Sequence, residues 1–305
     1  MGSVIQVAGC RKTYGKVVAV DEVSFDVLDG EIFGLIGPNG AGKTTTMECV
    51  EGLRAPDRGT IAVLGMDPIR DVYRLQERIG VQLQQAQLQK RITVWEAVDL
   101  WASLYRKRAV DGGRLLEQLG LADKRYAWFM TLSGGQTQRL FIALALINDP
   151  DIVFLDELTT GLDPQSRRTI WELVRGIRAR GKTVFLTTHL MEEAERLCDR
   201  VAIIDHGRIV DIDSPERLVA RHCPERTVEL SCEAADAAAR FRQIACVDAV
   251  SGDGGRVTIR GHGENFVTEV IQCLSEHRIR VTDFRTVLPT LEDVFLTVTG
   301  HSIRD

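Results

Sequence analysis

One nine-residue stretch constrains the fold more than any other part of the sequence. "GPNGAGKTT", residues 37–45, matches the pattern G-x-x-x-x-G-K-[ST]. It follows an apolar, strand-like segment, "EIFGLIG", and opens a segment, Lys43 to Gly52, that is predicted to be a helix closed by its glycine. A strand, a glycine-rich turn and a helix in this order converge backbone N–H groups on an anion. The residues expected to hold phosphate are Gly37, Pro38, Asn39, Gly40, Ala41, Gly42, Lys43, Thr44 and Thr45.

Two side chains of this loop carry specific expectations. Lys43 would reach the β- and γ-phosphates of a nucleotide and take part in catalysis, and the Thr44 hydroxyl would ligate Mg²⁺. The alternative is a glycine-rich turn between a strand and a helix, with an exposed lysine. The strand before the loop and the helix after it favour the phosphate site.

A second apolar strand ends in two carboxylates. "DIVFLDE", residues 151–157, delivers Asp156 to the polar end of the strand, where it would hold Mg²⁺ directly or through water. Glu157 would polarise the attacking water, because hydrolysis of a phosphoanhydride needs a positioned acceptor. Alone, such an ending could be a strand running out into a solvated loop. After a phosphate loop, it predicts a catalytic pair.

The order of segments predicts two domains. Short apolar strands alternate with helices up to about residue 220, which indicates an α/β domain with a mostly parallel sheet covered on both faces. A helical pattern runs from about residue 71 to residue 121. We expect a first domain at 1–222, with a helical subdomain at about 85–150. The remainder, 223–305, is expected to be a small α+β domain, since its segments follow the strand, helix, strand, strand, helix, strand order of a ferredoxin-like unit.

Composition excludes several classes of protein. The net charge of −5 argues against a nucleic-acid partner. No segment approaches the roughly 20 apolar residues of a membrane span, and the first residues lack the apolar core of a signal peptide. Seven scattered cysteines without a CxxC pair favour reduced thiols over disulfides or zinc. These features together predict a cytoplasmic protein.

The segment "LSGGQTQRLFIALALI" combines a helix signal with an unusual weakness. Ser133 and Gln136 form a predicted capping box. Gly134 and Gly135 follow in the first turn, although each glycine disfavours a helix by roughly 1 kcal/mol relative to alanine. A capping box alone leaves these glycines unexplained. They indicate that something approaches the helix start so closely that no side chain fits there.

With "GPNGAGKTT", "LSGGQ" and "IVFLDE" in this order, the chain resembles the ATP-binding subunits of ABC transporters over roughly residues 4–220. The resemblance implies a P-loop NTPase fold with ATP and Mg²⁺ as cofactors. It further implies that two copies lie head to tail, with each ATP between the phosphate loop of one chain and the "LSGGQ" motif of the other. Ser133, Gly134, Gly135 and Gln136 would then contact the partner's nucleotide.

The resemblance assigns four further positions. Tyr14 corresponds to the aromatic residue that stacks on adenine, although it could be a turn anchor. Gln84 falls where the family has a glutamine that contacts Mg²⁺, assists catalysis and reports to the membrane subunit, although a glutamine-rich loop is by default solvated. Asp163 would face the partner chain, and His189 would contact the γ-phosphate, although a histidine at a strand end is usually solvated. The chain departs from the family at Leu158, where proline is usual, and at "TQR", where "QQR" is commoner.

The second domain resembles the accessory domain of ATP-binding subunits of ABC-2 type exporters, which include drug and antibiotic self-resistance exporters. The resemblance implies a separate membrane permease partner, contact with it through the region after Gln84 ("LQKRITVWEAV"), and a location at the inner face of the cell membrane. The final "TLEDVFL" could pack on its own domain or serve dimerisation or regulation. Two rival functions remain, an ABC-type ATPase that acts on ribosomes or DNA without a permease, and a P-loop kinase. The spacing of the motifs, the charge and "LSGGQ" argue against both.

Overall fold

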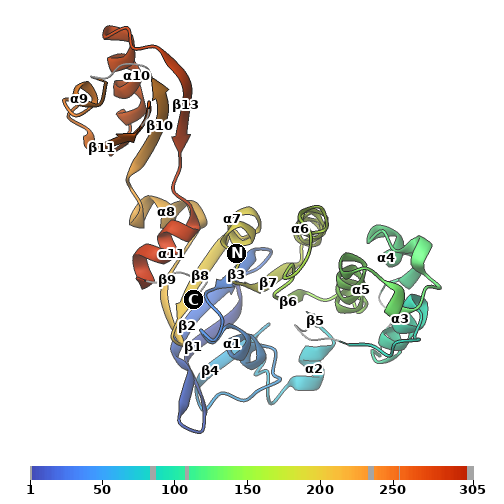
Figure 1. The fold of residues 1–305 in the computed structure, drawn as a ribbon. Coiled ribbons are helices and arrows are strands. Elements are labelled where there is room, and N and C mark those ends of the chain that lie inside the picture. The colour runs from blue at the N-terminus through green and yellow to red at the C-terminus, as the bar shows by residue number, and fades with distance from the viewer. Residues whose placement is uncertain (1, 83–86, 107–109, 233–236, 254, 301–305) are drawn as a thin grey trace. The chain divides into compact units, whose positions relative to one another are not determined.

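The chain forms two compact units, Met1–Pro215 and Glu216–His301 (Figure 1). The division falls after the first residue of α8 (Pro215–His222), a helix that the predicted boundary at 222 places in the first domain. The domain boundary stays a prediction. The residues that the computed structural model describes are 2–82, 87–106, 110–232, 237–253 and 255–300.

A six-stranded sheet forms the centre of the first unit. Its order is β5-β6-β7-β3-β8-β9, and all neighbours are parallel except β8 and β9. All residues of β3, β6 and β7 are buried, because a parallel sheet in this position is covered on both faces. The predicted mostly parallel sheet is confirmed. Its strands are β3 (Ile32–Ile36), β5 (Ile79–Gln82), β6 (Ile152–Asp156), β7 (Thr183–Thr188), β8 (Arg200–Asp205) and β9 (Arg208–Asp213).

The first unit also has a three-stranded antiparallel sheet, which the sequence analysis did not predict. Strands β1 (Ser3–Tyr14), β2 (Val17–Leu28) and β4 (Arg58–Val63) pair in the order β2-β1-β4. Helix α1 (Lys43–Val50) contacts strands of both sheets. One hydrophobic core joins the two sheets and α1, and Phe33 is among its fully buried members. One face of the parallel sheet is therefore covered by α1 and this second sheet.

Apart from α1 and α2, the helices of the first unit fall into two groups. Helices α3, α4 and α5 contact one another and form the green part of Figure 1. Helices α6 and α7 pack on the parallel sheet through β7 and β3. The predicted helical stretch at 71–121 is interrupted by β5, a strand too short to stand out in the pattern. The helices are α2 (Val72–Gln76), α3 (Val94–Ser103), α4 (Gly112–Gln118), α5 (Gly134–Leu146), α6 (Pro164–Ala179) and α7 (Met191–Leu197), with 3₁₀ helices at Ala122–Lys124 and Phe129–Thr131.

The second unit has the predicted ferredoxin-like arrangement. Its four strands pair antiparallel throughout, in the order β11-β12-β10-β13. Side chains of alternate strand positions, such as Val228 and Ile259, form a core with Phe241 and Phe266 from the helices. Its elements are α8, β10 (Arg226–Cys232), α9 (Ala237–Phe241), β11 (Val247–Asp253), β12 (Arg256–Gly261), α10 (Phe266–Glu276), β13 (Val281–Val287) and α11 (Leu291–Thr299).

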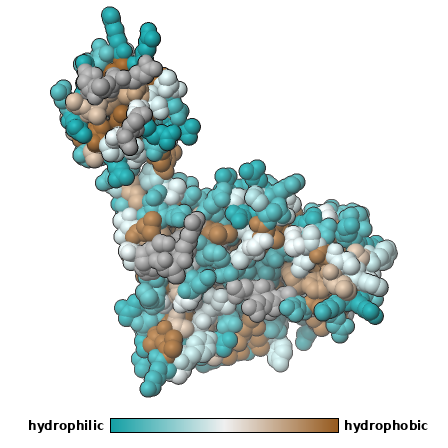
Figure 2. All heavy atoms as spheres, in the orientation of Figure 1, coloured by the Kyte–Doolittle hydropathy of each residue, from teal (hydrophilic) through white to brown (hydrophobic). Residues whose placement is uncertain are grey.

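The visible surface is mainly hydrophilic, with hydrophobic side chains in small patches (Figure 2). Within the described ranges, no helix is both long enough and apolar enough to span a membrane.

Candidate nucleotide site

The phosphate loop lies between the end of β3 and the start of α1, and two of its glycines are required by close neighbours. A Cβ atom at Gly37 would lie 2.2 Å from the carbonyl oxygen of Ile204. One at Gly42 would lie 2.4 Å from the carbonyl oxygen of Ala19, and Gly42 has a φ of +102°, which favours glycine. The loop therefore keeps a shape that larger residues would break.

Lys43 is almost completely buried at the start of α1. Its Nζ donates hydrogen bonds to the carbonyl oxygens of Gly37 and Pro38, both at 2.9 Å. It also lies 3.9 Å from Glu157 Oε1. Burial lowers the pKa of Lys43, and the nearby carboxylates of Glu157 and Asp156 oppose this shift. The ammonium group is thus held against the loop, where phosphate oxygens could replace the carbonyls as its acceptors.

Asp156 ends β6 beside two hydroxyls. Its Oδ2 accepts a hydrogen bond of 3.3 Å from Thr44 Oγ1, and its Oδ1 accepts one from Thr187 Oγ1 on β7. Burial raises the pKa of Asp156, and the charge of Glu157 adds to this effect, while the Thr187 hydrogen bond lowers it. A buried carboxylate with a raised pKa is stabilised when a cation binds beside it.

This oxygen-rich corner fits Mg²⁺. Thr44 and Asp156 supply hard oxygen atoms within hydrogen-bond distance of each other. No group of three or more His, Cys, Asp or Glu residues that could hold a metal exists in the described part of the chain. Mg²⁺ typically binds one or two protein oxygens and takes its remaining ligands from phosphates and water. The corner is therefore suited to a metal that arrives with a nucleotide.

Glu157 follows β6 in a backbone conformation that is rare for a non-glycine residue. Its φ is +47°, and its N–H donates to the carbonyl oxygen of Thr187 at 3.1 Å. Its Oε1 lies 3.4 Å from His189 Nδ1, at the end of β7. Non-glycine residues held in this region are found at functional sites more often than elsewhere. The turn directs the Glu157 carboxylate toward both Lys43 and His189.

The "LSGGQ" segment starts α5 with the predicted capping box. The Ser133 hydroxyl accepts from the Gln136 N–H at 3.4 Å, and the Gln136 side chain accepts from the Ser133 N–H at 3.0 Å. A hollow of about 190 Å³ beside it is lined by residues of α5 and α6, including Ser133 and Gly135, and by none of residues 37–45.

The two glycines of this segment differ in their surroundings. A Cβ atom at Gly135 would lie 2.8 Å from Ser166 Oγ on α6, so packing within the chain gives one reason for this glycine. A Cβ atom at Gly134 would meet only Leu162, at 3.4 Å. Gly134 therefore has no explanation within the described part of the chain, whereas Gly135 has a partial one.

The remaining predicted residues have varied surroundings. Tyr14, at the end of β1, is 41% exposed, and the Arg54 guanidinium lies 5.3 Å from its ring centroid. Asp163 is the N-cap of α6 and accepts from the N–H groups of Gln165 and Ser166. The Ser166 hydroxyl also donates to Asp163 and lowers its pKa. Gln84 lies outside the described residues.

The sequence analysis missed two kinds of supporting residue. Thr187, which bonds Asp156, is one of several threonines on β7, and nothing in the pattern singles it out. Glu193 on α7 is 1% exposed, and its Oε1 accepts hydrogen bonds from Thr159 Oγ1 at 2.7 Å and from Trp171 Nε1 at 3.1 Å. This buried network links the segment after Glu157 to α6 and α7, and only the fold brings its members together.

Known proteins resemble the chain throughout its length. The ABC transporter family profile matches residues 20–160. The Nod factor export ATP-binding protein I of Ralstonia nicotianae is 38% identical, over 99% of this chain and 95% of that protein. The linearmycin resistance ATP-binding protein of Bacillus subtilis is 34% identical, over 99% of this chain and all of that protein.

Solved structures resemble about 70% of the chain. One described as the ATP-binding subunit of an ABC transporter has a TM-score of 0.65 and 27% identity, over 72% of this chain and 92% of that one. Another, a dimeric ATP-binding cassette in a post-hydrolysis state with ADP and Pi, has a TM-score of 0.62 and 28% identity, over 69% of this chain and 98% of that one. The chain belongs to the ABC transporter family as one of its ATP-binding proteins, and it is an ATPase.

Proposed function

We propose that this chain hydrolyses MgATP in sites shared between two copies and thereby drives a separate membrane permease of the ABC-2 type. The observation that carries this proposal is the cluster at the carboxyl ends of β3, β6 and β7. There the Lys43 ammonium lies 3.9 Å from Glu157, Thr44 bonds Asp156, and His189 lies 3.4 Å from Glu157. These are the groups that a phosphoryl transfer to water requires.

The side chains of the cluster and Tyr14 have the following roles in this proposal. Lys43 binds the β- and γ-phosphate oxygens, and the loop N–H groups of residues 37–45 bind the phosphates from the other side. Glu157 accepts a proton from the attacking water, and His189 contacts the γ-phosphate and orients the Glu157 carboxylate. Tyr14 stacks on adenine.

Thr44, Asp156 and Gln84 are the residues proposed to hold Mg²⁺. When bound, the ion neutralises charge on the β- and γ-phosphates. The raised pKa of Asp156 supports this assignment, since the hydrogen bonds from Thr187 and Thr44 offset the effect of burial only in part and a bound cation would offset more of it.

A second copy supplies the rest of each site. Ser133, Gly134, Gly135 and Gln136 are proposed to contact the γ-phosphate of the nucleotide on the partner's loop, with Asp163 near the dimer contact. The unexplained Gly134 supports this arrangement, since a side chain there would obstruct a partner rather than its own chain.

A complementation experiment tests the shared site. Lys43→Ala disables the phosphate loop, and Ser133→Arg places a long side chain in the "LSGGQ" motif where the γ-phosphate must bind. Each mutant homodimer should therefore be nearly inactive. In an isolated mixed dimer both defects fall in one site, and activity should return to about half of the wild-type value because the other site is intact. The control is a mixed dimer of wild type with Lys43→Ala, which shows whether one intact site turns over alone. If it does, and the mixed mutant dimer stays inactive, the shared site is wrong.

The proposals of a permease partner and of export are based on the names of the relatives. Two relatives that align with this chain over 95% and 100% of their lengths are named for Nod factor export and for linearmycin resistance. Export of a drug-like or other small molecule is therefore the proposed activity, with the chain attached to the inner face of the cell membrane through its permease. The proposed contact includes residues 88–98, which run from a loop into α3 behind a Thr93–Glu96 capping box. The domain assignment of 1–222 for ATP and 223–305 for an accessory role belongs to the same proposal.

A further inference from the structure

The Tyr14 ring has a cation over one of its faces. The Arg54 guanidinium lies over this ring, with its Cζ atom 5.3 Å from the ring centroid, within the range of a cation–π contact. Tyr14 is still 41% exposed although it has this neighbour. A planar base stacks on the face of an aromatic ring. Because Arg54 covers one face, a base that stacks on this ring while the contact persists must use the other face.

Glu48 on α1 holds the Arg54 side chain in place. Arg54 Nε donates to Glu48 Oε2 at 2.6 Å, and Arg54 Nη2 donates to Glu48 Oε1 at 3.2 Å, so the pair is bidentate. A bidentate pair fixes the plane of a guanidinium as well as its position. The two side chains are 40% and 27% exposed, and ion pairs in such surroundings contribute little to stability. The main consequence of this pair is therefore the fixed position of the guanidinium.

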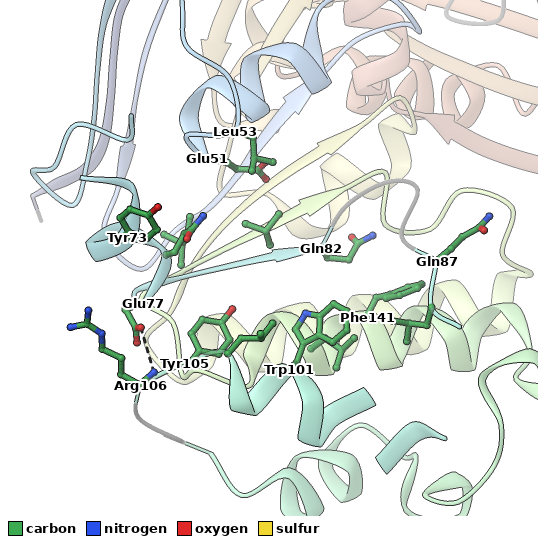
Figure 3. Close-up of a pocket in the computed structure, with 16 residues that line it drawn as sticks. Glu51, Leu53, Tyr73, Glu77, Gln82, Gln87, Trp101, Tyr105, Arg106 and Phe141 are labelled. Carbon is green, nitrogen blue, oxygen red and sulfur yellow. Dashed lines mark hydrogen bonds between the residues drawn. The ribbon is translucent and has the colours of Figure 1, made fainter. Parts of the chain in front are cut away.

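The backbone of Arg54 is bonded to the same residue. The N–H groups of Leu53 and Arg54 donate to the carbonyl oxygen of Glu48, at 2.9 Å and 3.1 Å. Gly52, just before them, has a φ of +79°, and a Cβ atom there would lie 2.3 Å from the carbonyl oxygen of Pro68. In this turn Leu53 lines a pocket of about 740 Å³ (Figure 3), whereas Arg54 does not line it. The Arg54 side chain instead runs back to α1 and to the Tyr14 ring.

The end of β1 that carries Tyr14 is tied to the chain just after this turn. Asp57 accepts from the N–H and the hydroxyl of Thr13, both at 2.7 Å, and from Lys12 Nζ at 2.9 Å. Lys12 Nζ also donates to the carbonyl oxygen of Ala55 at 2.8 Å. The Lys12 hydrogen bond is the largest of the causes that lower the pKa of Asp57 to about 2, so this carboxylate stays charged at neutral pH. These contacts keep the ring next to the guanidinium.

We propose that Arg54 is a positioning residue for the base of the nucleotide, because it holds the Tyr14 ring in the orientation in which adenine stacks on the opposite face. This inference rests on the proposed function, since it assigns a supporting residue to the proposed adenine site. A side chain that is ordered only when a ligand binds lowers the affinity for that ligand. Arg54 orders the ring before the nucleotide arrives. Since Glu48 lies on α1, which begins at Lys43, the contact also joins the proposed base site to the helix of the phosphate loop.

A double-mutant cycle on the full chain tests the proposal. The probe is ADP, which carries adenine and has no γ-phosphate to transfer. Its dissociation constant is measured by calorimetry for wild type, Arg54→Met, Tyr14→Ala and the double variant. Methionine keeps an unbranched apolar side chain and removes the charge. Thermal unfolding verifies that each variant is folded at the temperature of the titration.

Arg196→Met is the matched control for the loss of an arginine. Arg196 also pairs with a glutamate, Glu192, at 3.0 Å, and its guanidinium lies 5.5 Å from the ring centroid of Trp171. None of these three is a candidate site residue. Arg196→Met should therefore bind ADP like the wild type.

Removal of the Arg54 guanidinium should weaken ADP binding only while Tyr14 is present. Arg54→Met alone should raise the dissociation constant about three- to tenfold, the range for one side chain that must be ordered on binding. In the Tyr14→Ala background the same substitution should change it by less than about twofold, because no ring is left to hold. Glu48→Gln, which weakens the anchor and keeps the guanidinium, should give a smaller increase that also requires Tyr14.

Each other outcome contradicts a particular step. If Arg54→Met weakens binding equally in both backgrounds, Arg54 acts through its charge or through α1 and not through the ring. If it strengthens binding, Arg54 covers the face that the base needs, and the proposed role has the wrong sign. If Arg54→Met binds ADP like the wild type while Tyr14→Ala binds it more weakly, adenine stacking stands and the role of Arg54 is wrong. If Tyr14→Ala leaves the affinity unchanged, the stacking in the proposed function fails, and the role of Arg54 fails with it.

Discussion

The two units of this chain bury different kinds of residue. All the buried polar or charged residues of the described structure lie in the first unit, between Glu31 and Glu193. The second unit buries hydrophobic side chains, such as Phe241 and Phe266, and its described Asp, Glu, Arg and His side chains are partly or fully exposed. Burying polar groups costs free energy unless they are paired or serve a ligand. The difference therefore locates the chemistry in the first unit and leaves the second as a conventionally packed domain.

The largest expected effect tests whether chemistry depends on Glu157. Replacement by glutamine keeps the size of the side chain and removes the proton acceptor, so the hydrolysis rate should fall by about 10²–10⁴-fold. ATP binding should persist, because Lys43 and the loop are intact. A phosphate-release assay with ATP-binding measurements would test this, and ATP-bound dimers should accumulate on size exclusion. Hydrolysis near the wild-type rate would remove Glu157 from the catalytic role.

A core substitution in the second unit tests whether that unit serves only as a packed domain, without a part in ATP hydrolysis. The Phe266 ring is fully buried, and a Cβ atom at Gly261 would lie 2.5 Å from it, so the ring fills its space closely. Phe266→Ala should destabilise this unit by about 3–5 kcal/mol. Calorimetry should show an earlier unfolding transition, while ATPase activity below that temperature stays within about twofold because no candidate site residue belongs to this unit. Loss of ATPase activity in the folded variant would show that the two units are not functionally separate.

The buried carboxyl of Glu51 should make the stability of the first unit depend on pH. Its pKa is raised to about 8 in the folded chain, so the folded state holds a proton that the unfolded state has lost. Stability should therefore fall as pH rises from about 4.5 to 8, by at most about 5 kcal/mol at roughly 1.36 kcal/mol per pKa unit.

Glu51→Gln should remove this loss, and the variant should unfold later than wild type at pH 9 but not at pH 5. Denaturant unfolding at both pH values tests the effect. Equal pH dependence in the two proteins would place the titration elsewhere.

The smallest expected effect concerns Tyr14. If its exposed ring stacks on adenine, Tyr14→Ala should weaken ATP and ADP binding alike by about 1–3 kcal/mol, the range for base–aromatic stacking. Calorimetric titration with both nucleotides gives the comparison. Unchanged affinity for both would return Tyr14 to the role of a turn anchor.

The sequence predicted what depends on local pattern and on family motifs. The phosphate-loop strand and helix, the capping box of Ser133 and the element order of the second unit are all present as predicted. It did not reveal the separate antiparallel sheet, because alternating strands show their period but not their partners.

The residues that support the site could not be predicted either, because sequence patterns do not show which distant residues become partners. Thr187 is 31 residues from Asp156, and Glu193 is 34 from Thr159, so only the sheet and helix packing bring them together. The motifs identified the groups proposed to touch the nucleotide. They contained no information on which residues hold those groups in place.

Helix α1 begins at Lys43 and is followed directly by Glu51. At 1.5 Å per residue, its eight residues span about 12 Å. A hydrogen-bonded helix of two turns behaves as a stiff rod, and this one is wedged between two sheets. A displacement of Glu51 along the helix axis is therefore expected to move Lys43 as well, through the hydrogen-bonded backbone of α1.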